Sequence, residues 1–174
     1  MTHFLRQLTL WLALVLTLSA PAAARGVYLP PAEFIHSTFG QEIKPRMIWL
    51  SKELQHGIKQ ILGHPYPALR LRYWHNGARS AWILEEIGKE KPITFGIVVN
   101  QGRIEQFHVL EFRESRGSEI RYPFFTEQFV SLRLDGLQLN GDIDGISGAT
   151  LSVRAGKKMA RLALYLHQQI TGAP

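Results

Sequence analysis

One stretch of the sequence brings together glycines, hydroxyl side chains and a carboxylate just before an amphipathic segment. It reads Asp144-Gly145-Ile146-Ser147-Gly148-Ala149-Thr150-Leu151-Ser152. Gly145 and Gly148 allow backbone conformations that other residues resist, and Ser147 is a favoured type for a helix N-cap. Free backbone N–H groups would then converge where the helix dipole is positive, and such a place binds phosphate.

The segment after this stretch predicts a C-terminal helix. Apolar residues recur there at steps of three and four, which places them on one helical face. They are Val153, Ala155, Met159, Leu162, Ala163, Leu166 and Ile170, with charged and polar residues mostly between them. Two interpretations of the whole stretch follow: an ordinary capped helix after a turn, or a phosphate site at a helix start.

The string itself resembles the flavin-attachment motif of the FMN-binding domain family, which is Asp, two residues, then Ser or Thr-Gly-Ala-Thr. Members include the flavin-carrying periplasmic subunits of the sodium-pumping NADH:quinone reductase and of the Rnf electron-transport complex. Four specified residues in order occur by chance in roughly one chain in a few hundred of this length. The resemblance extends over about residues 70–170.

The resemblance implies that Thr150 is the acceptor of FMN. Its hydroxyl would be esterified to the flavin phosphate by a separate flavin transferase that uses FAD. A cofactor tethered in this way cannot diffuse away. The expected cofactor-binding residues of this string are Thr150, Asp144, Ser147, Gly148, Ala149, Leu151 and Ser152.

Residues 68–112 predict an antiparallel meander of four strands. The expected strands are 68–75, 80–87, 93–99 and 103–112. Asn76-Gly77 and Asn100-Gln101-Gly102 are hairpin signals, and a charged loop spans 88–92. Trp74 and Trp82 are expected to pack in the core rather than stack on a ligand.

A second part of the resemblance follows the last of these strands. Family members carry a Glu-Thr-Pro-Gly segment beside the flavin, and this chain has Glu114-Ser115-Arg116-Gly117. Glu114 is therefore expected near the cofactor, and the alternative is a solvated loop carboxylate. Arg116 replaces a proline, so the dihedral angle that proline would fix is left free.

Two helices are expected before the sheet. Pro30-Pro31 begins the first, which ends at Gly40, and Ser51 caps the second, which runs to Leu62 and ends at Gly63. The expected fold class is α+β: an antiparallel sheet of about four or more strands packed against N-terminal helices and a C-terminal helix.

Residues 1–24 have the pattern of a secretory signal, with Arg6, an apolar run from Leu8 to Leu18 and Ala22-Ala23-Ala24 as cleavage site. Residues 25–174 would then form a single FMN-binding domain in the periplasm. The alternative is that the apolar segment stays uncleaved as a membrane anchor.

Composition excludes several classes of chemistry. The 174 residues contain no cysteine, which removes disulfides, thiolate metal sites and thiol catalysis. The charges that sum to +6 are scattered along the sequence, and no nucleic-acid motif is visible.

Residues 140–145 match the first six positions of an EF-hand loop, but Leu151 stands where its bidentate Glu belongs. No metal site is expected.

The function that these features favour is electron relay by an exported flavoprotein. No nucleotide-binding fingerprint for a hydride donor is present, so the flavin would exchange electrons with a membrane-bound redox partner. Two alternatives remain: a ligand-binding or sensor domain of the same fold without a covalent flavin, and a stand-alone flavin reductase.

Overall fold

The computed structural model describes residues 26–172, and the predicted signal at 1–24 lies outside them. The helices are α2 (Pro31–Phe39), α3 (Lys52–Leu62), α4 (Pro123–Thr126) and α5 (Thr150–Thr171). The strands are β1 (Gly26–Val27), β2 (Arg46–Trp49), β3 (Arg70–Asn76), β4 (Arg79–Ile87), β5 (Pro92–Asn100), β6 (Arg103–Phe112), β7 (Leu134–Asp135) and β8 (Gln138–Leu139). None of the described helices is both long and apolar enough to cross a bilayer.

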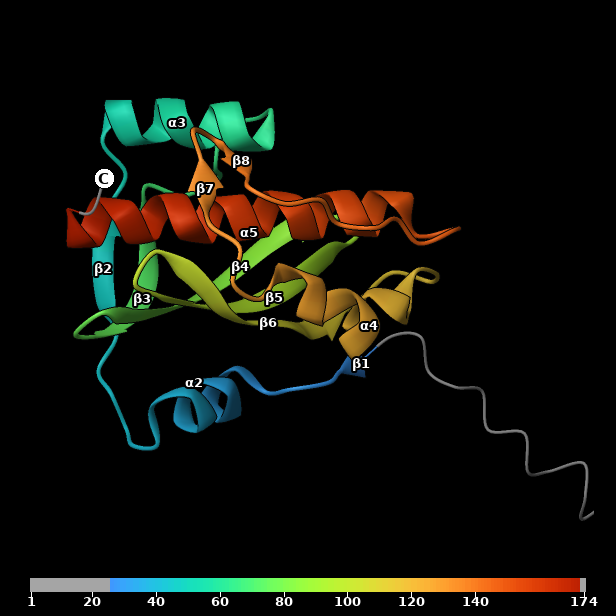
Figure 1. Cartoon of the computed structure of the whole chain (residues 1–174), viewed down its shortest axis with the longest axis horizontal. Helices are drawn as coiled ribbons and strands as arrows, with labels where there is room; N and C mark the ends of the chain where they lie inside the picture. Colours follow the sequence, from blue (N-terminus) through green and yellow to red (C-terminus); the bar gives the residue numbers. More distant parts are fainter. Residues whose placement is uncertain (1–25, 173–174) are drawn as a thin grey trace, which may run out of the picture.

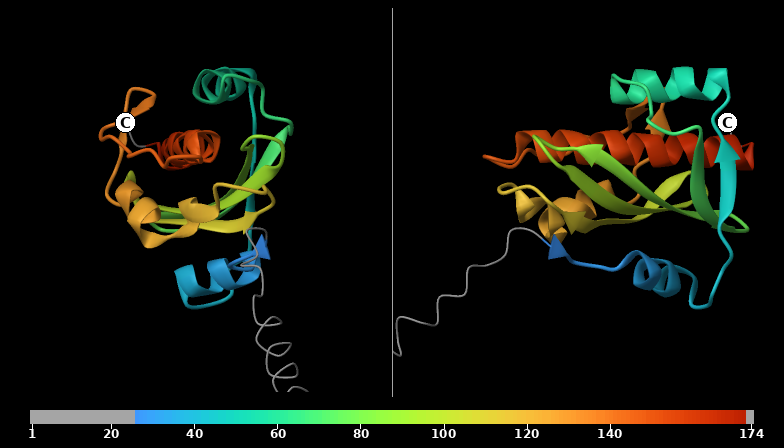
Figure 2. Two further views of the ribbon diagram at one scale, coloured as in Figure 1. Left: turned by 90° about the vertical axis from the view of Figure 1, so that its right-hand side faces the viewer. Right: turned by 180° about the vertical axis from the view of Figure 1, so that it is seen from behind.

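Six strands form one antiparallel sheet in the order β1-β6-β5-β4-β3-β2. The sheet curves around α5, which lies along its concave face, and α3 packs beside α5. Helix α2 lies on the opposite face (Figures 1 and 2). The expected α+β class, with N-terminal helices and a C-terminal helix on an antiparallel sheet, is confirmed.

The meander of β3 to β6 forms as the turn signals predict, with one adjustment. Asn76 pairs with Arg79, so the loop residues are Gly77 and Ala78 rather than Asn76 and Gly77. Gly77 has a φ of +61°, which a glycine adopts without steric cost. The β5–β6 turn lies at Gln101-Gly102, as expected.

Both N-terminal helices begin and end where their caps predict. The Ser51 hydroxyl oxygen accepts the backbone N–H of Leu54 at 3.2 Å, which satisfies one free donor at the start of α3. Gly40 and Gly63 end α2 and α3 in the left-handed conformation.

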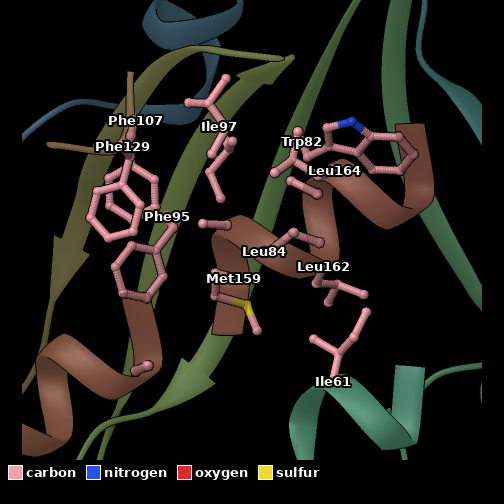
Figure 3. Packing of buried hydrophobic residues seen from close by; sticks show 14 of the residues in the cluster. Ile61, Trp82, Leu84, Phe95, Ile97, Phe107, Phe129, Met159, Leu162 and Leu164 are labelled. Atoms are coloured by element: carbon pink, nitrogen blue, oxygen red, sulfur yellow. The ribbon is translucent and has the colours of Figure 1, made fainter. Parts of the chain in front are cut away.

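The main core lies between the sheet and α5 (Figure 3). Trp82 on β4 and Phe95 on β5 are fully buried against the helix, which contributes Met159 and Leu162. Burying each large apolar side chain contributes about 1.5–3 kcal/mol. The prediction that Trp82 packs in the core is confirmed, whereas Trp74 is half-buried on the α2 side of the sheet.

The segment between the sheet and α5 contains three short helical turns. Residues 118–129 form the 3₁₀ turns η1 (Ser118–Arg121) and η2 (Glu127–Phe129), with α4 between them. Phe129 is buried and stacks on Phe107 with ring centroids 4.0 Å apart. Gly136 and Leu137 form the loop of the small β7–β8 hairpin.

A buried polar network ties the far end of α5 to the sheet. The Ser80 hydroxyl on β4 accepts the Trp82 indole N–H at 2.8 Å and lies 2.8 Å from Nδ1 of His167. The backbone N–H of Gly102 donates to His167 Nε2 at 3.3 Å, so the ring proton sits on Nδ1. The neutral imidazole thereby links α5 to both β4 and the β5–β6 turn.

This network predicts acid sensitivity. Burial, with the nearby His75 as a second cause, lowers the pKa of His167 to about 4. In the unfolded chain His167 therefore binds a proton near pH 6.5, whereas in the folded chain it stays neutral down to about pH 4. The free energy of unfolding falls as the pH drops from about 6.5 toward 4. We expect this residue to account for a loss of about 3 kcal/mol.

Urea unfolding of the wild type and of His167→Gln between pH 7.5 and pH 4 measures this contribution as the difference between the two curves. The matched control is His56→Gln, since His56 is exposed on α3. A His167→Gln profile parallel to the wild type would contradict the assignment.

Candidate functional site

The motif of residues 144–152 spans a turn and the start of α5. Ser147 and Gly148 form the turn, with Gly148 at a φ of +79°, and the Ala149 N–H donates to the Ile146 carbonyl at 3.0 Å. The helix begins at Thr150, so the N-cap position belongs to Ala149. The expectation that Ser147 caps the helix is wrong, because Ser147 lies in the turn, two residues before the N-cap position.

The absence of a side-chain cap leaves backbone donors available. Ala149 makes no capping hydrogen bond, and the first bond of the helix runs from the Val153 N–H to the Ala149 carbonyl. Within residues 26–172, the N–H groups of Thr150, Leu151 and Ser152 have no acceptor. Three donors at the positive end of a 22-residue helix make a local anion site.

The residues of the motif divide into an exposed and a buried set. Ala149 and Ser152 are buried, at 3% and 5% exposure, and hold the start of α5 to the fold. The exposed set faces solvent around the free donors: Asp144, Ser147, Gly148, Thr150 and Leu151. Thr150 therefore presents its side chain from the first position of the helix.

The Glu114–Gly117 segment lies directly against this helix start. A Cβ placed on Gly117 would lie 3.2 Å from the Ala149 Cβ and 3.0 Å from the Ser152 hydroxyl. Gly117 also has a φ of +85°, which favours glycine. The structure thus brings together the two stretches that carry the resemblance, although Gly117 and Ala149 are 32 positions apart in the sequence.

Glu114 is neither exposed nor solvated. Only 5% of it is accessible, and its Oε1 accepts backbone N–H groups from Lys89, Glu90 and Lys91 at 2.6, 2.6 and 2.9 Å. Burial pushes the pKa of the carboxyl up, but the three hydrogen bonds outweigh it and the net shift is downward. The solvated-carboxylate alternative is wrong; Glu114 holds the β4–β5 loop, and contact with the cofactor stays a prediction.

One residue that positions the motif was not predicted from the sequence. The Gln128 side-chain oxygen accepts the Asp144 N–H at 2.7 Å and so positions the beginning of the motif. No local pattern marks Gln128, because its role depends on the path of the chain between 128 and 144.

The fold and this site define an α+β domain whose long helix starts at an exposed threonine beside free N–H donors, an arrangement suited to a phosphate-bearing group. Residues 88–165 match the family model of the FMN-binding domain, so the chain carries an FMN-binding domain and is a flavin-binding protein. This range begins after β4 and ends within α5, which is narrower than the resemblance over about 70–170. No curated protein and no solved structure matches the chain.

The contact at Gly117 predicts a specific cost of a side chain there. Gly117→Ala forces a residue with a Cβ into a left-handed conformation and against Ala149. We expect a loss of about 2–4 kcal/mol of unfolding free energy, from the backbone strain and the collision together. Thermal or urea denaturation measures it.

Gly40→Ala is the matched control, since Gly40 has a φ of +68° and nothing within 4 Å of its Cβ position. Its expected cost is about 1–2 kcal/mol from strain alone. Equal losses in the two variants would show that the contact with Ala149 is unimportant.

The hydrogen bonds of Glu114 predict a local effect on the β4–β5 loop. Glu114→Gln removes the charge that three N–H groups share, and we expect a destabilisation of about 1–3 kcal/mol. Amide hydrogen exchange at residues 89–91 should accelerate most. Glu119→Gln, at an exposed position, should leave exchange at 89–91 unchanged.

Proposed function

We propose that this protein is an exported electron-transfer flavoprotein that carries FMN covalently on Thr150 through a phosphoester. The exposed Thr150 at the first position of α5, beside three free N–H donors, is the observation that carries the proposal. The FMN-binding domain over 88–165 supports the identity of the group.

The attachment step balances with FAD as the donor. The Thr150 hydroxyl oxygen forms a bond to the phosphorus on the flavin side of the FAD pyrophosphate. The phosphoanhydride bond on the other side of that phosphorus breaks, AMP leaves, and the hydroxyl proton goes to solvent. A flavin transferase catalyses this exchange, and no electrons are transferred in it.

This chain's own residues then hold the phosphate end of the group. An ester phosphate on Thr150 retains negative charge, and the N–H groups of Thr150, Leu151 and Ser152 are the nearest free donors. The dipole of α5 adds to the attraction by about 0.3–1 kcal/mol at such an exposed position. Ala149 and Gly117 keep these donors in place through their contact.

The flavin supplies the redox chemistry, and the protein supplies attachment and orientation. The sequence contains no nucleotide-binding fingerprint for a hydride donor of its own. We therefore assign it the role of a relay between a membrane-bound redox partner and a further acceptor. The signal-like segment at 1–24 supports a periplasmic location.

Intact-mass spectrometry tests the attachment. Protein produced together with a flavin transferase should gain the mass of one FMN less one water, and protein produced without the transferase should not. Thr150→Ala should abolish the gain, because no acceptor oxygen remains. The matched control is Thr171→Ala, since Thr171 is an exposed threonine at the other end of the same helix.

The same preparations separate the alternatives. A flavin that co-purifies without a mass gain, and is released on denaturation, would support non-covalent binding. Steady turnover of the isolated protein with a soluble donor would support a reductase. The relay predicts one stoichiometric reduction of the bound flavin and reoxidation only when an acceptor is added.

A further inference from the structure

An apolar groove lies on the face of the sheet opposite α5. It is bounded by α2 on one side and by β2 and β3 on the other, and its volume is about 1650 Å³. All of its lining residues precede residue 88, outside the FMN-binding match. Figure 2 shows α2 and α5 on opposite faces of the sheet, so the groove does not compete with the site at Thr150.

The strand alternation explains the groove's floor. On β3, Arg70, Arg72 and Trp74 line the groove, while Leu71 and Tyr73 pack in the main core. On β2, Met47 and Trp49 line it, and they are the cross-strand partners of Arg72 and Arg70. Apolar and cationic side chains therefore lie side by side along the floor.

Much of this apolar surface is exposed. The accessible fractions of Trp49, Leu69 and Met47 are 67%, 70% and 42%. Large apolar residues that gather at one exposed place mark an interaction surface. Tryptophan and arginine are also the residue types enriched among interface hot spots.

The charged side chains that line the groove differ in sign between β3 and the α2 side. The Arg70 guanidinium lies 5.6 Å from the centre of the Trp49 ring, and neither Arg70 nor Arg72 has a carboxylate partner within the described residues. Glu33 and Glu42 line the α2 side of the groove. A complementary occupant is acidic where it lies over β3 and apolar where it lies over the edge strand β2.

The groove's size and openness favour a polypeptide helix. Small-molecule sites occupy about 300–1,000 Å³ and enclose most of their ligand, and this groove is larger and is not enclosed. A helix about 10 Å across occupies roughly 80 Å³ per ångström, so the volume corresponds to about three to four turns.

We propose that this groove docks an amphipathic helix of a partner protein, with the helix's apolar stripe on Met47, Trp49 and Leu69 and its acidic flank over Arg70 and Arg72. This is helix-in-groove recognition. The proposal does not depend on flavin attachment, since α2, which lines the groove, and α5, which begins at Thr150, lie on opposite faces of the sheet (Figure 2).

Fluorescence anisotropy with two synthetic probes tests the proposal on the chain purified without its signal segment. Both probes are labelled 15-residue helical peptides with the same leucine stripe, and the flanking charges are Glu in one and Lys in the other. We expect the Glu peptide to bind at least about tenfold more tightly than the Lys peptide. Trp49→Ala should weaken it by about tenfold, as for a hot-spot residue.

Charge reversal gives the sharper comparison. The double variant Arg70→Glu, Arg72→Glu should reverse the preference between the two peptides. Lys52→Glu, Lys59→Glu makes the same change in net charge at exposed positions on α3 and should preserve the preference. All of these positions are exposed, and thermal unfolding verifies that each variant is folded.

Three results would overturn the proposal. The first is that the two peptides bind equally or not at all. The second is that the chain binds vesicles rich in phosphatidylglycerol rather than either peptide, and that the Arg70, Arg72 charge reversal abolishes this vesicle binding. That result would make the face a membrane-binding surface. The third is self-association in sedimentation that Trp49→Ala removes, which would make it an interface between copies.

Discussion

The burial of α5 in the concave face of the sheet is the constraint on which the rest of the structure depends. Eleven of the helix's 22 residues are buried, and they meet side chains from β4, β5 and β6. A helix held along most of its length cannot shift or rotate without opening the core. Its first residue, Thr150, therefore has a defined position although it is exposed.

The starts of α3 and α5 differ in whether a side chain satisfies their free backbone N–H groups. At α3, Ser51 fills the cap position and satisfies a donor with its own hydroxyl. At α5, Ala149 occupies the cap position and its side chain satisfies no backbone donor. Ser147 lies in the turn with Gly148, two residues before the cap position. An uncapped start is a local cost that a bound phosphate would offset.

Buried charge in this protein serves to hold loops and layers in place. One carboxylate oxygen of Glu114 accepts hydrogen bonds from three backbone N–H groups of the β4–β5 loop. Glu86 on β4 accepts from Lys158 on α5 at 2.8 Å and lies 3.1 Å from His64 in the segment after α3. Because an unpaired buried carboxylate is costly, these contacts specify one arrangement of the elements around the sheet.

The amino-acid sequence alone predicted α2, α3, α5 and β3 to β6 and singled out the motif of residues 144–152, but it did not predict the short strands β1, β2, β7 and β8. Turn residues, glycine helix ends and the Ser51 cap predicted β3 to β6, α2 and α3, since each signal acts through the backbone of a few neighbouring residues. The single Asp-x-x-Ser-Gly-Ala-Thr pattern likewise predicted Thr150 as the acceptor without any contact information.

The contacts between residues that are distant in the sequence became known only from the folded structure. The placement of Gly117 against Ala149, the bond from Asp144 to Gln128 and the burial of Glu114 join residues that are 16 to 32 positions apart or belong to different loops. The groove of Trp49, Arg70 and Arg72 also arises only when β2 pairs with β3 beside α2. The reason is physical: local sequence sets backbone preference, whereas burial and accessible charge are set by which surfaces the folded chain brings together.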